Sequence, residues 1–165
     1  MDVTHVSTLG RLKYLHVTID TYSHMIWATV QPGEKVRDVR RHLTSCFVVL
    51  GVPITIKTDS GPAYSSGPLK RFMQLWDIKH ITGIPHSPMG QAIVERANGT
   101  LKRYLEKFKD IEDVRERVEK VLFVLNHLCI FEDNCDPPVI CHYGVSEGLK
   151  PPCMKVLYKD MKTGQ

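Results

Sequence analysis

The sequence predicts an α/β domain in which a mixed sheet of five strands is flanked by helices. Three strand-like segments follow one another near the start, and strand and helix patterns then alternate before two longer helical patterns. A chain of 165 residues with 42% hydrophobic content can bury one sizeable core. No apolar run of about 20 residues is present, so we expect no membrane-spanning segment.

The first 50 residues predict an antiparallel meander followed by a helix. Residues 3–30 are rich in β-branched and aromatic side chains, and the connections between the three strand-like runs are short. Gln31-Pro32-Gly33 then ends the sheet. Apolar residues at helical spacing predict an amphipathic helix over 34–50, which Gly51 ends. These apolar residues are Val36, Val39, Leu43, Phe47 and Leu50.

The remaining elements alternate in type. We expect strands at 54–58 and 78–81, a short helix at 69–76, longer helices at 91–108 and 112–128, and loop at 83–90 and 129–143. Residues 145–149 predict a helical turn, and Pro151-Pro152 marks a boundary. The domain organisation that follows is a core at 1–148 and, at 149–165, a linker with the first strand of a further domain.

The helix at 91–108 has two distinct sides. Its apolar side carries Ile93, Ala97, Leu101 and Leu105, while the opposite side carries Gln91, Glu95, Asn98, Gly99 and Lys102. Glu95 therefore faces away from the apolar side of this helix, toward either solvent or a functional site. The prolines and glycines of 83–90 predict a flexible loop just before this helix.

Three acids on separate elements predict a divalent-metal site. Asp2 lies on the first strand, Asp59 follows the strand at 54–58, and Glu95 lies on a helix 35 residues beyond Asp59. Phosphodiester chemistry is served by two cations about 4 Å apart, and carboxylate oxygens suit Mg²⁺ or Mn²⁺. Asp2 is the natural bridging ligand between the two ions. Each acid taken alone is better explained as a solvated or capping residue, and it is the combination of the three that favours a metal site.

Four segments together resemble the catalytic core of a retroviral integrase of the betaretroviral or endogenous-retrovirus type. The resemblance covers almost the whole chain, and the spacing of the three acids inside these segments is specific to that family. The segments are Met1–His5, Lys57–Tyr64, Gly83–Pro88 and Gly90–Arg96.

The resemblance implies a ribonuclease H-like fold that dimerises and uses Mg²⁺. Such a core trims the 3′ ends of viral DNA with water and joins them to target DNA through the 3′-hydroxyls, in the virion and the host nucleus. Asp2, Asp59 and Glu95 match the metal-binding triad of the family. His86, which replaces a commoner Tyr, and Gln91 match loop positions that contact DNA ends.

Further positions match or depart from the family. Lys102 matches a lysine that contacts DNA phosphates, on the same side of the helix as Glu95. Ser60 stands where these proteins usually carry Asn. The zinc-binding domain that precedes such cores has no counterpart in this sequence, so we expect an excised core that retains metal binding and partial reactions.

Other readings stay open at this point. A transposase or nuclease of the same fold would share the acids, and a domesticated, integrase-derived module that binds DNA or protein would keep the fold and lose the chemistry. A net charge of +4 allows a nucleic-acid partner without requiring one. Five cysteines without a C-x-x-C pair suit a reducing, intracellular compartment. The spacing of His127, Cys129, Cys135, Cys141 and His142 fits no familiar zinc pattern.

Overall fold

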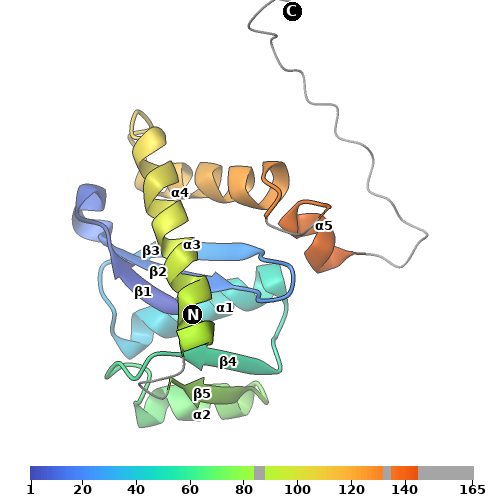
Figure 1. Cartoon of the computed structure of the whole chain (residues 1–165). Helices are drawn as coiled ribbons and strands as arrows, with labels where there is room; N and C mark the ends of the chain where they lie inside the picture. Colours follow the sequence, from blue (N-terminus) through green and yellow to red (C-terminus); the bar gives the residue numbers. More distant parts are fainter. Residues whose placement is uncertain (84–87, 132–134, 145–165) are drawn as a thin grey trace, which may run out of the picture.

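The computed structural model describes residues 1–83, 88–131 and 135–144, with only the backbone for 88–91. The helical turn expected at 145–149 and the linker and further domain expected at 149–165 lie outside the described residues. Within the described ranges, no helix is long and apolar enough to cross a membrane. Helices lie on both faces of the strands in Figure 1, as the sequence predicts.

The first sheet is the predicted antiparallel meander. It contains β1 (Asp2–His5), β2 (Tyr14–Ile19) and β3 (Ile26–Gln31), in that spatial order. Asp2 lies opposite Val17 in the register. A short 3₁₀ segment, η1 (Ser7–Leu12), connects β1 to β2.

The second sheet pairs β4 (Thr55–Thr58) with β5 (Lys79–Thr82) in parallel. The five strands of the described residues thus form a three-stranded and a two-stranded sheet, and the expected continuous five-stranded sheet is not confirmed. One hydrogen bond links the sheets, since the Met1 nitrogen donates to the Lys57 carbonyl at 2.8 Å. A single bond is too little to make a ladder, yet it holds the start of β1 beside β4.

Most helices match the prediction, with two corrections. The first two helices are α1 (Val36–Leu50) and α2 (Gly67–Leu75). Gly51, with φ 78°, follows the last residue of α1 and ends it as predicted. The third, α3 (Pro88–Lys107), begins inside the stretch expected to be loop, because proline is well suited to the first turn of a helix. Residues 84–87 of that stretch lie outside the described part of the chain.

The second correction concerns the segment after the predicted helix at 112–128. That helix is present as α4 (Val114–Phe123) and continues as the π-helical segment η2 (Val124–Leu128). The expected loop at 129–143 contains a further helix, α5 (Pro138–Tyr143). The loop prediction is wrong there because proline residues that break a helix interior also start one.

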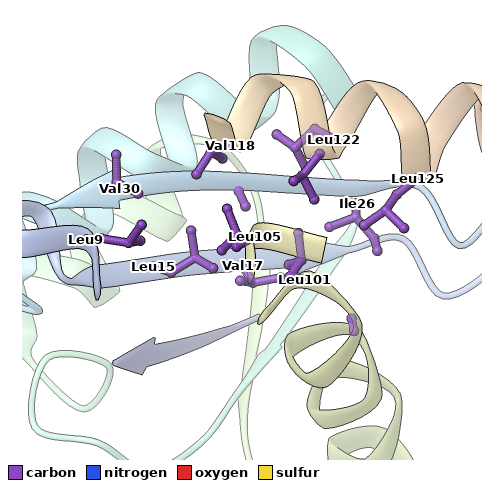
Figure 2. Packing of buried hydrophobic residues seen from close by; sticks show 13 residues of the cluster. Leu9, Leu15, Val17, Ile26, Val30, Leu101, Leu105, Val118, Leu122 and Leu125 are labelled. Carbon is purple, nitrogen blue, oxygen red and sulfur yellow. The ribbon is translucent and has the colours of Figure 1, made fainter. Parts of the chain in front are cut away.

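The main core lies between the first sheet and the pair α3 and α4, as Figure 2 shows. Leu15 and Val17 of β2 are fully buried, as are Leu101 of α3 and Val121 of α4. A second core lies among α1, α2 and β4, where Leu43 and Leu69 are fully buried. These two cores hold the edge of the first sheet against β4.

The face of the sheet under α1 is polar rather than apolar. His42 of α1 is fully buried, and its two ring nitrogens each lie 2.8 Å from a threonine hydroxyl, that of Thr18 on β2 and that of Thr29 on β3. His16 is also fully buried, and its Nε2 lies 2.9 Å from the Gly33 carbonyl. Burial lowers the pKa of both imidazoles, and the proximity of His16 lowers the pKa of His42 further.

His142 holds α5 against two other elements. Its Nδ1 lies 3.1 Å from both Asp20 Oδ2 and Ser23 Oγ, and its Nε2 lies 3.0 Å from the Leu50 carbonyl at the end of α1. Tyr143 donates a hydrogen bond to the Val49 carbonyl beside it. The serine and the carboxylate contact the same ring nitrogen, whereas a nucleophile–base relay uses opposite nitrogens. This cluster therefore has a structural role, which is to attach α5 to the end of α1 and to the connection between β2 and β3.

We predict that acid destabilises the fold through His16 and His42. Both are neutral when folded, while an unfolded histidine takes up a proton near pH 6.5, so the unfolded chain binds more protons as the pH falls. The free energy of unfolding should be flat above about pH 7.5 and fall below pH 6.5, by up to about 1.4 kcal/mol per pH unit for each histidine. Urea unfolding between pH 5 and pH 8 measures this slope.

The exposed His5 provides the control for this measurement. His5→Gln should leave the slope unchanged, whereas His42→Gln should reduce it by about half if the variant folds. A free energy of unfolding that stays constant down to pH 5 in the unmodified chain would contradict the assignment.

Candidate metal centre

Asp2 is held in place at the start of β1 by two hydrogen bonds. Its Oδ1 accepts from the backbone nitrogen of Val3 at 2.8 Å, and its Oδ2 accepts from Asn98 Nδ2 on α3 at 2.7 Å. Asn98 is only 7% exposed, so its amide is fixed by packing. In Figure 1 the N-terminus accordingly lies beside α3. A strand and a helix far apart in the sequence thus fix one carboxylate.

Asp59 follows β4 and is fixed by a tight turn. Its Oδ1 accepts from the backbone nitrogen of Gly61 at 3.1 Å. A Cβ atom at position 61 would lie 3.2 Å from this oxygen and 3.4 Å from the Tyr64 ring, so glycine allows the close approach. The buried Thr58 hydroxyl donates to the Asp59 carbonyl at 2.9 Å and lies 2.9 Å from His80 Nε2 on β5.

Asp2 and Asp59 interact electrostatically. The pKa of Asp2 is raised, first by burial and then by the negative charge of Asp59, against the lowering effect of its hydrogen bonds to Val3 and Asn98. Both carboxylates also help burial to raise the pKa of the Tyr64 phenol. Two carboxylates that repel each other at the junction of two sheets offer hard oxygen ligands, and a divalent cation would relieve the repulsion. The residues present therefore fit Mg²⁺ or Mn²⁺.

Glu95 lies on α3, one turn before Asn98, and its side chain is exposed. It is therefore on the same side of α3 as the residue that contacts Asp2. Within residues 1–83, 92–131 and 135–144, no three His, Cys, Asp or Glu side chains come close enough together to hold a metal ion. The structure brings Asp2 and Asp59 together and places Glu95 on the adjoining helix.

The expected DNA-contact residues are only partly described. Lys102 lies two turns beyond Glu95 on α3 and is exposed. Gln91 lies in the first turn of α3, but only its backbone is described, and His86 lies outside the described residues.

Four supporting residues were not identified from the sequence as parts of the site. The position of Asn98, three residues after Glu95, already places it on the site side of the helix, but its bond to Asp2 could not be foreseen. Tyr64 is 6% exposed, and its hydroxyl is buried without a hydrogen-bond partner among the described residues. No sequence pattern signals the contact between Thr58 and His80, since it depends on the pairing of β4 with β5.

An antiparallel meander followed by a parallel strand pair, with helices on both faces, defines the ribonuclease H-like class of proteins. A model of the integrase core domain matches residues 1–88. The Gag-Pro-Pol polyprotein of mouse mammary tumor virus (strain BR6) is 44% identical over 168 residues, which cover 99% of this chain and 9% of the polyprotein. That of Mason-Pfizer monkey virus is 47% identical over 140 residues, 81% of this chain and 8% of the polyprotein.

Solved structures agree with this family. The HTLV-2 integrase catalytic core domain in complex with magnesium is similar with a TM-score of 0.73 at 28% identity, over 86% of this chain and 92% of that chain. The simian T-cell lymphotropic virus intasome in complex with PP2A regulatory subunit B56 gamma is similar with a TM-score of 0.78 at 30% identity, over 96% and 58%. The chain belongs to the integrase core domain family, as a catalytic core of the betaretroviral type. It spans less than a tenth of the polyproteins it matches.

We predict that Asp59→Asn stabilises the metal-free chain, by up to about 1 kcal/mol, because it removes the repulsion of Asp2. The asparagine oxygen can still accept the hydrogen bond from Gly61. Urea unfolding in the presence of EDTA at pH 7.5 measures the change. Asp110→Asn, at an exposed site, is the matched control and should have little effect. A clear loss of stability in Asp59→Asn would mean that the two carboxylates do not repel each other.

Proposed function

We propose that this core is a polynucleotidyl transferase that trims the 3′ ends of viral DNA and joins them to target DNA by in-line phosphoryl transfer with two divalent cations. The observation that carries the proposal is the carboxylate pair Asp2 and Asp59, whose charges interact beside the helix that bears Glu95. Membership of the integrase core family supports the reaction class.

Each residue of the candidate centre has a proposed role. Asp2 would bind both cations and Asp59 and Glu95 one each, and the cations when bound supply Lewis-acid stabilisation of the phosphoryl oxygens. Asn98 orients the Asp2 carboxylate, and the turn at Gly61 orients Asp59. Glu95 has an exposed side chain, so it is free to adjust its rotamer on binding.

DNA would lie along the exposed side of α3. We assign His86 and Gln91 to contacts with the DNA ends and Lys102 to a phosphate contact. Arg103 and Lys107 are further exposed cations of the same helix, and their charged groups lie 5.8 and 4.9 Å from the centre of the Tyr104 ring. A cationic helix beside a carboxylate site suits a polyanionic substrate.

Cofactor, assembly and location are proposed from the relatives. One similar core was solved in complex with magnesium, in dimeric and trimeric forms, and another belongs to an intasome. We propose that this chain uses Mg²⁺ or Mn²⁺, forms a homodimer that enters a higher oligomer in the full-length protein, and acts in the virion and the host nucleus.

A domesticated core that binds DNA or protein without chemistry is the second candidate. Ser60 favours it, because this serine stands beside Asp59 where the family usually has Asn, and its hydroxyl donates to the Gly83 carbonyl at 3.0 Å. The side chain is thus engaged in holding the end of β5 rather than in contacting substrate. Asp2, Asp59 and Glu95 are nonetheless all retained.

The proposal predicts that Asp59→Asn abolishes Mg²⁺-dependent cleavage and strand transfer on labelled DNA ends, with a loss of at least about a thousandfold. Folding should remain intact by circular dichroism, since the turn at Gly61 is preserved. Asp110→Asn, at an exposed position, should retain the activity. Activity at the unmodified level in Asp59→Asn would refute the assignment, and an unmodified chain that binds DNA without cleaving it would establish the second candidate.

Asn98→Leu should weaken the binding of Mn²⁺ by about 10- to 100-fold, because the Asp2 carboxylate loses the amide that orients it. Leucine has nearly the same shape, and within the described part of the chain the Asn98 Oδ1 is buried without a hydrogen-bond partner, so the fold should tolerate the change. The dependence of the thermal unfolding midpoint on Mn²⁺ concentration measures the affinity. Gln74→Leu, on the exposed side of α2, is the control. An identical Mn²⁺ titration for Asn98→Leu and the unmodified chain would remove Asn98 from the site.

A further inference from the structure

Side chains on both sides of Asp59 attach it to β5. The residue before it, Thr58, has its hydroxyl 2.9 Å from His80 Nε2. The residue after it, Ser60, donates from its hydroxyl to the Gly83 carbonyl at 3.0 Å. The Gly83 nitrogen donates in turn to the Thr58 carbonyl at 2.7 Å. Because β4 ends at Thr58, these contacts with β5 decide where Asp59 lies beyond the end of its own strand.

The hydrogen bonds of the buried Thr58 hydroxyl have a fixed direction. A threonine hydroxyl has one proton to donate and two lone pairs that accept. Thr58 donates its proton to the Asp59 carbonyl at 2.9 Å, so toward His80 the hydroxyl can only accept. The Nε2 of His80 therefore carries a hydrogen and donates it. The result is a directed chain in which His80 donates to Thr58 and Thr58 donates to the backbone of Asp59.

The chain ends on the peptide unit that orients the Asp59 side chain. This unit is planar, so a hydrogen bond to its carbonyl holds the whole peptide between Asp59 and Ser60. The backbone angles that it fixes restrict the rotamers open to the Asp59 carboxylate. At its far end the carboxylate is held by the Gly61 nitrogen at 3.1 Å. Asp59 is thus held at both its backbone and its side chain, and such preorganisation favours cation binding.

The His80 ring lies where its substitution is tolerated. It is half-buried on β5, opposite Ile56 in the register, and it borders a hollow of about 470 Å³ that Lys70 and Gln74 of α2 also line. Within the described part of the chain, the contact with Thr58 is the one hydrogen bond of this side chain. Because a ring beside a hollow has little packing on that side, a leucine or an amide side chain fits in its place.

Pairing of the two strands does not require this chain. The strands β4 and β5 are already joined by a parallel ladder over four residue pairs, from Thr55 with Lys79 to Thr58 with Thr82. A side-chain bond that served only to join them would add little to that ladder. The chain from His80 leads instead past the end of the ladder to Asp59, so its geometry points to the metal centre.

We propose that His80 is a positioning residue of the metal centre and acts on Asp59 through the hydroxyl of Thr58. Neither His80 nor Thr58 contacts the cation in this arrangement. They fix the direction of a ligand, as the hydrogen-bond partners of metal ligands do. The inference rests on the proposed function, because it takes Asp59 as a metal ligand.

The test is a double-mutant cycle on the affinity of the full chain for Mn²⁺, with His80→Leu, Thr58→Val and both together. Each single variant should weaken Mn²⁺ binding by about 10- to 100-fold. The combined variant should bind no more weakly than either single variant, because His80 acts only through Thr58. The dependence of the thermal unfolding midpoint on Mn²⁺ concentration gives the affinity, separately from any change in the midpoint without metal.

Two amide variants separate the hydrogen-bond donor from the bulk of the ring, and they carry the test where His80→Leu does not fold. The amide nitrogen of glutamine reaches the position of Nε2, whereas that of asparagine is one methylene shorter and reaches the position of Nδ1. His80→Gln should keep the Mn²⁺ affinity within about threefold, and His80→Asn should bind about 10- to 100-fold more weakly. Thr55→Val, which removes a hydroxyl from an exposed position of the same strand, is the control and should keep the affinity.

Three results would overturn the proposal: an unchanged Mn²⁺ affinity in His80→Leu, additive losses in the combined variant, or equal affinities in His80→Gln and His80→Asn. Asp59→Asn separates this inference from the proposed function. If Asp59→Asn binds Mn²⁺ as the unmodified chain does, Asp59 is no ligand, and both the inference and the proposed function fail. If Asp59→Asn loses the cation and the His80 variants keep it, the role of His80 fails alone.

Discussion

The hydrogen bond from Asn98 to Asp2 is the contact on which the candidate centre depends. It joins residues 96 positions apart and fixes the first residue of β1 against α3. The Met1 nitrogen, bonded to the Lys57 carbonyl, fixes the other side of the same strand end against β4. Three elements therefore converge at the end of β1: β1 with Asp2, α3 with Glu95, and β4, which Asp59 follows. Burial of Asn98 makes this geometry rigid, since a buried amide that lost its partner would cost about 1–3 kcal/mol.

The first sheet separates two different environments, and each has its own role. The face under α3 and α4 is apolar and supplies most of the hydrophobic stabilisation, through residues such as Leu15, Val17 and Leu101. The face under α1 carries His16 of β2, and His42 of α1 bonds to Thr18 and Thr29 on this face, which specifies one position of α1 rather than a range of similar ones. The polar face thus fixes geometry at the cost of stability in acid, while the apolar face supplies stability.

The sequence predicts those strands and helices whose conformation is decided by neighbouring residues. The β-branched runs before Gln31 predict the meander, and the apolar spacing from Val36 to Leu50 predicts α1 and its end at Gly51, because in both cases neighbouring residues decide the conformation. Prediction failed at Pro88 and Pro138, where a proline begins a helix instead of extending a loop. The resemblance named the three acids, but no local pattern predicts the partners that orient them. Those partners come from strand pairing and helix docking, which bring distant residues together.

The charges of the chain are distributed between its two faces more sharply than a net charge of +4 suggests. Asp2 and Asp59 interact where β1, β4 and α3 meet, while the exposed Arg37, Arg40 and Arg41 lie on α1, which packs on the other face of the first sheet. A bound cation would relieve the repulsion between the two carboxylates, and the like charges of the three arginines are also mutually unfavourable. Both the carboxylate pair and the arginines of α1 lower the stability of the isolated domain, so a contribution to stability does not explain their presence. A metal ion at Asp2 and Asp59 would remove an unfavourable interaction that the fold maintains, whereas the three arginines stand at the end of α1 at which positive charge is least favourable.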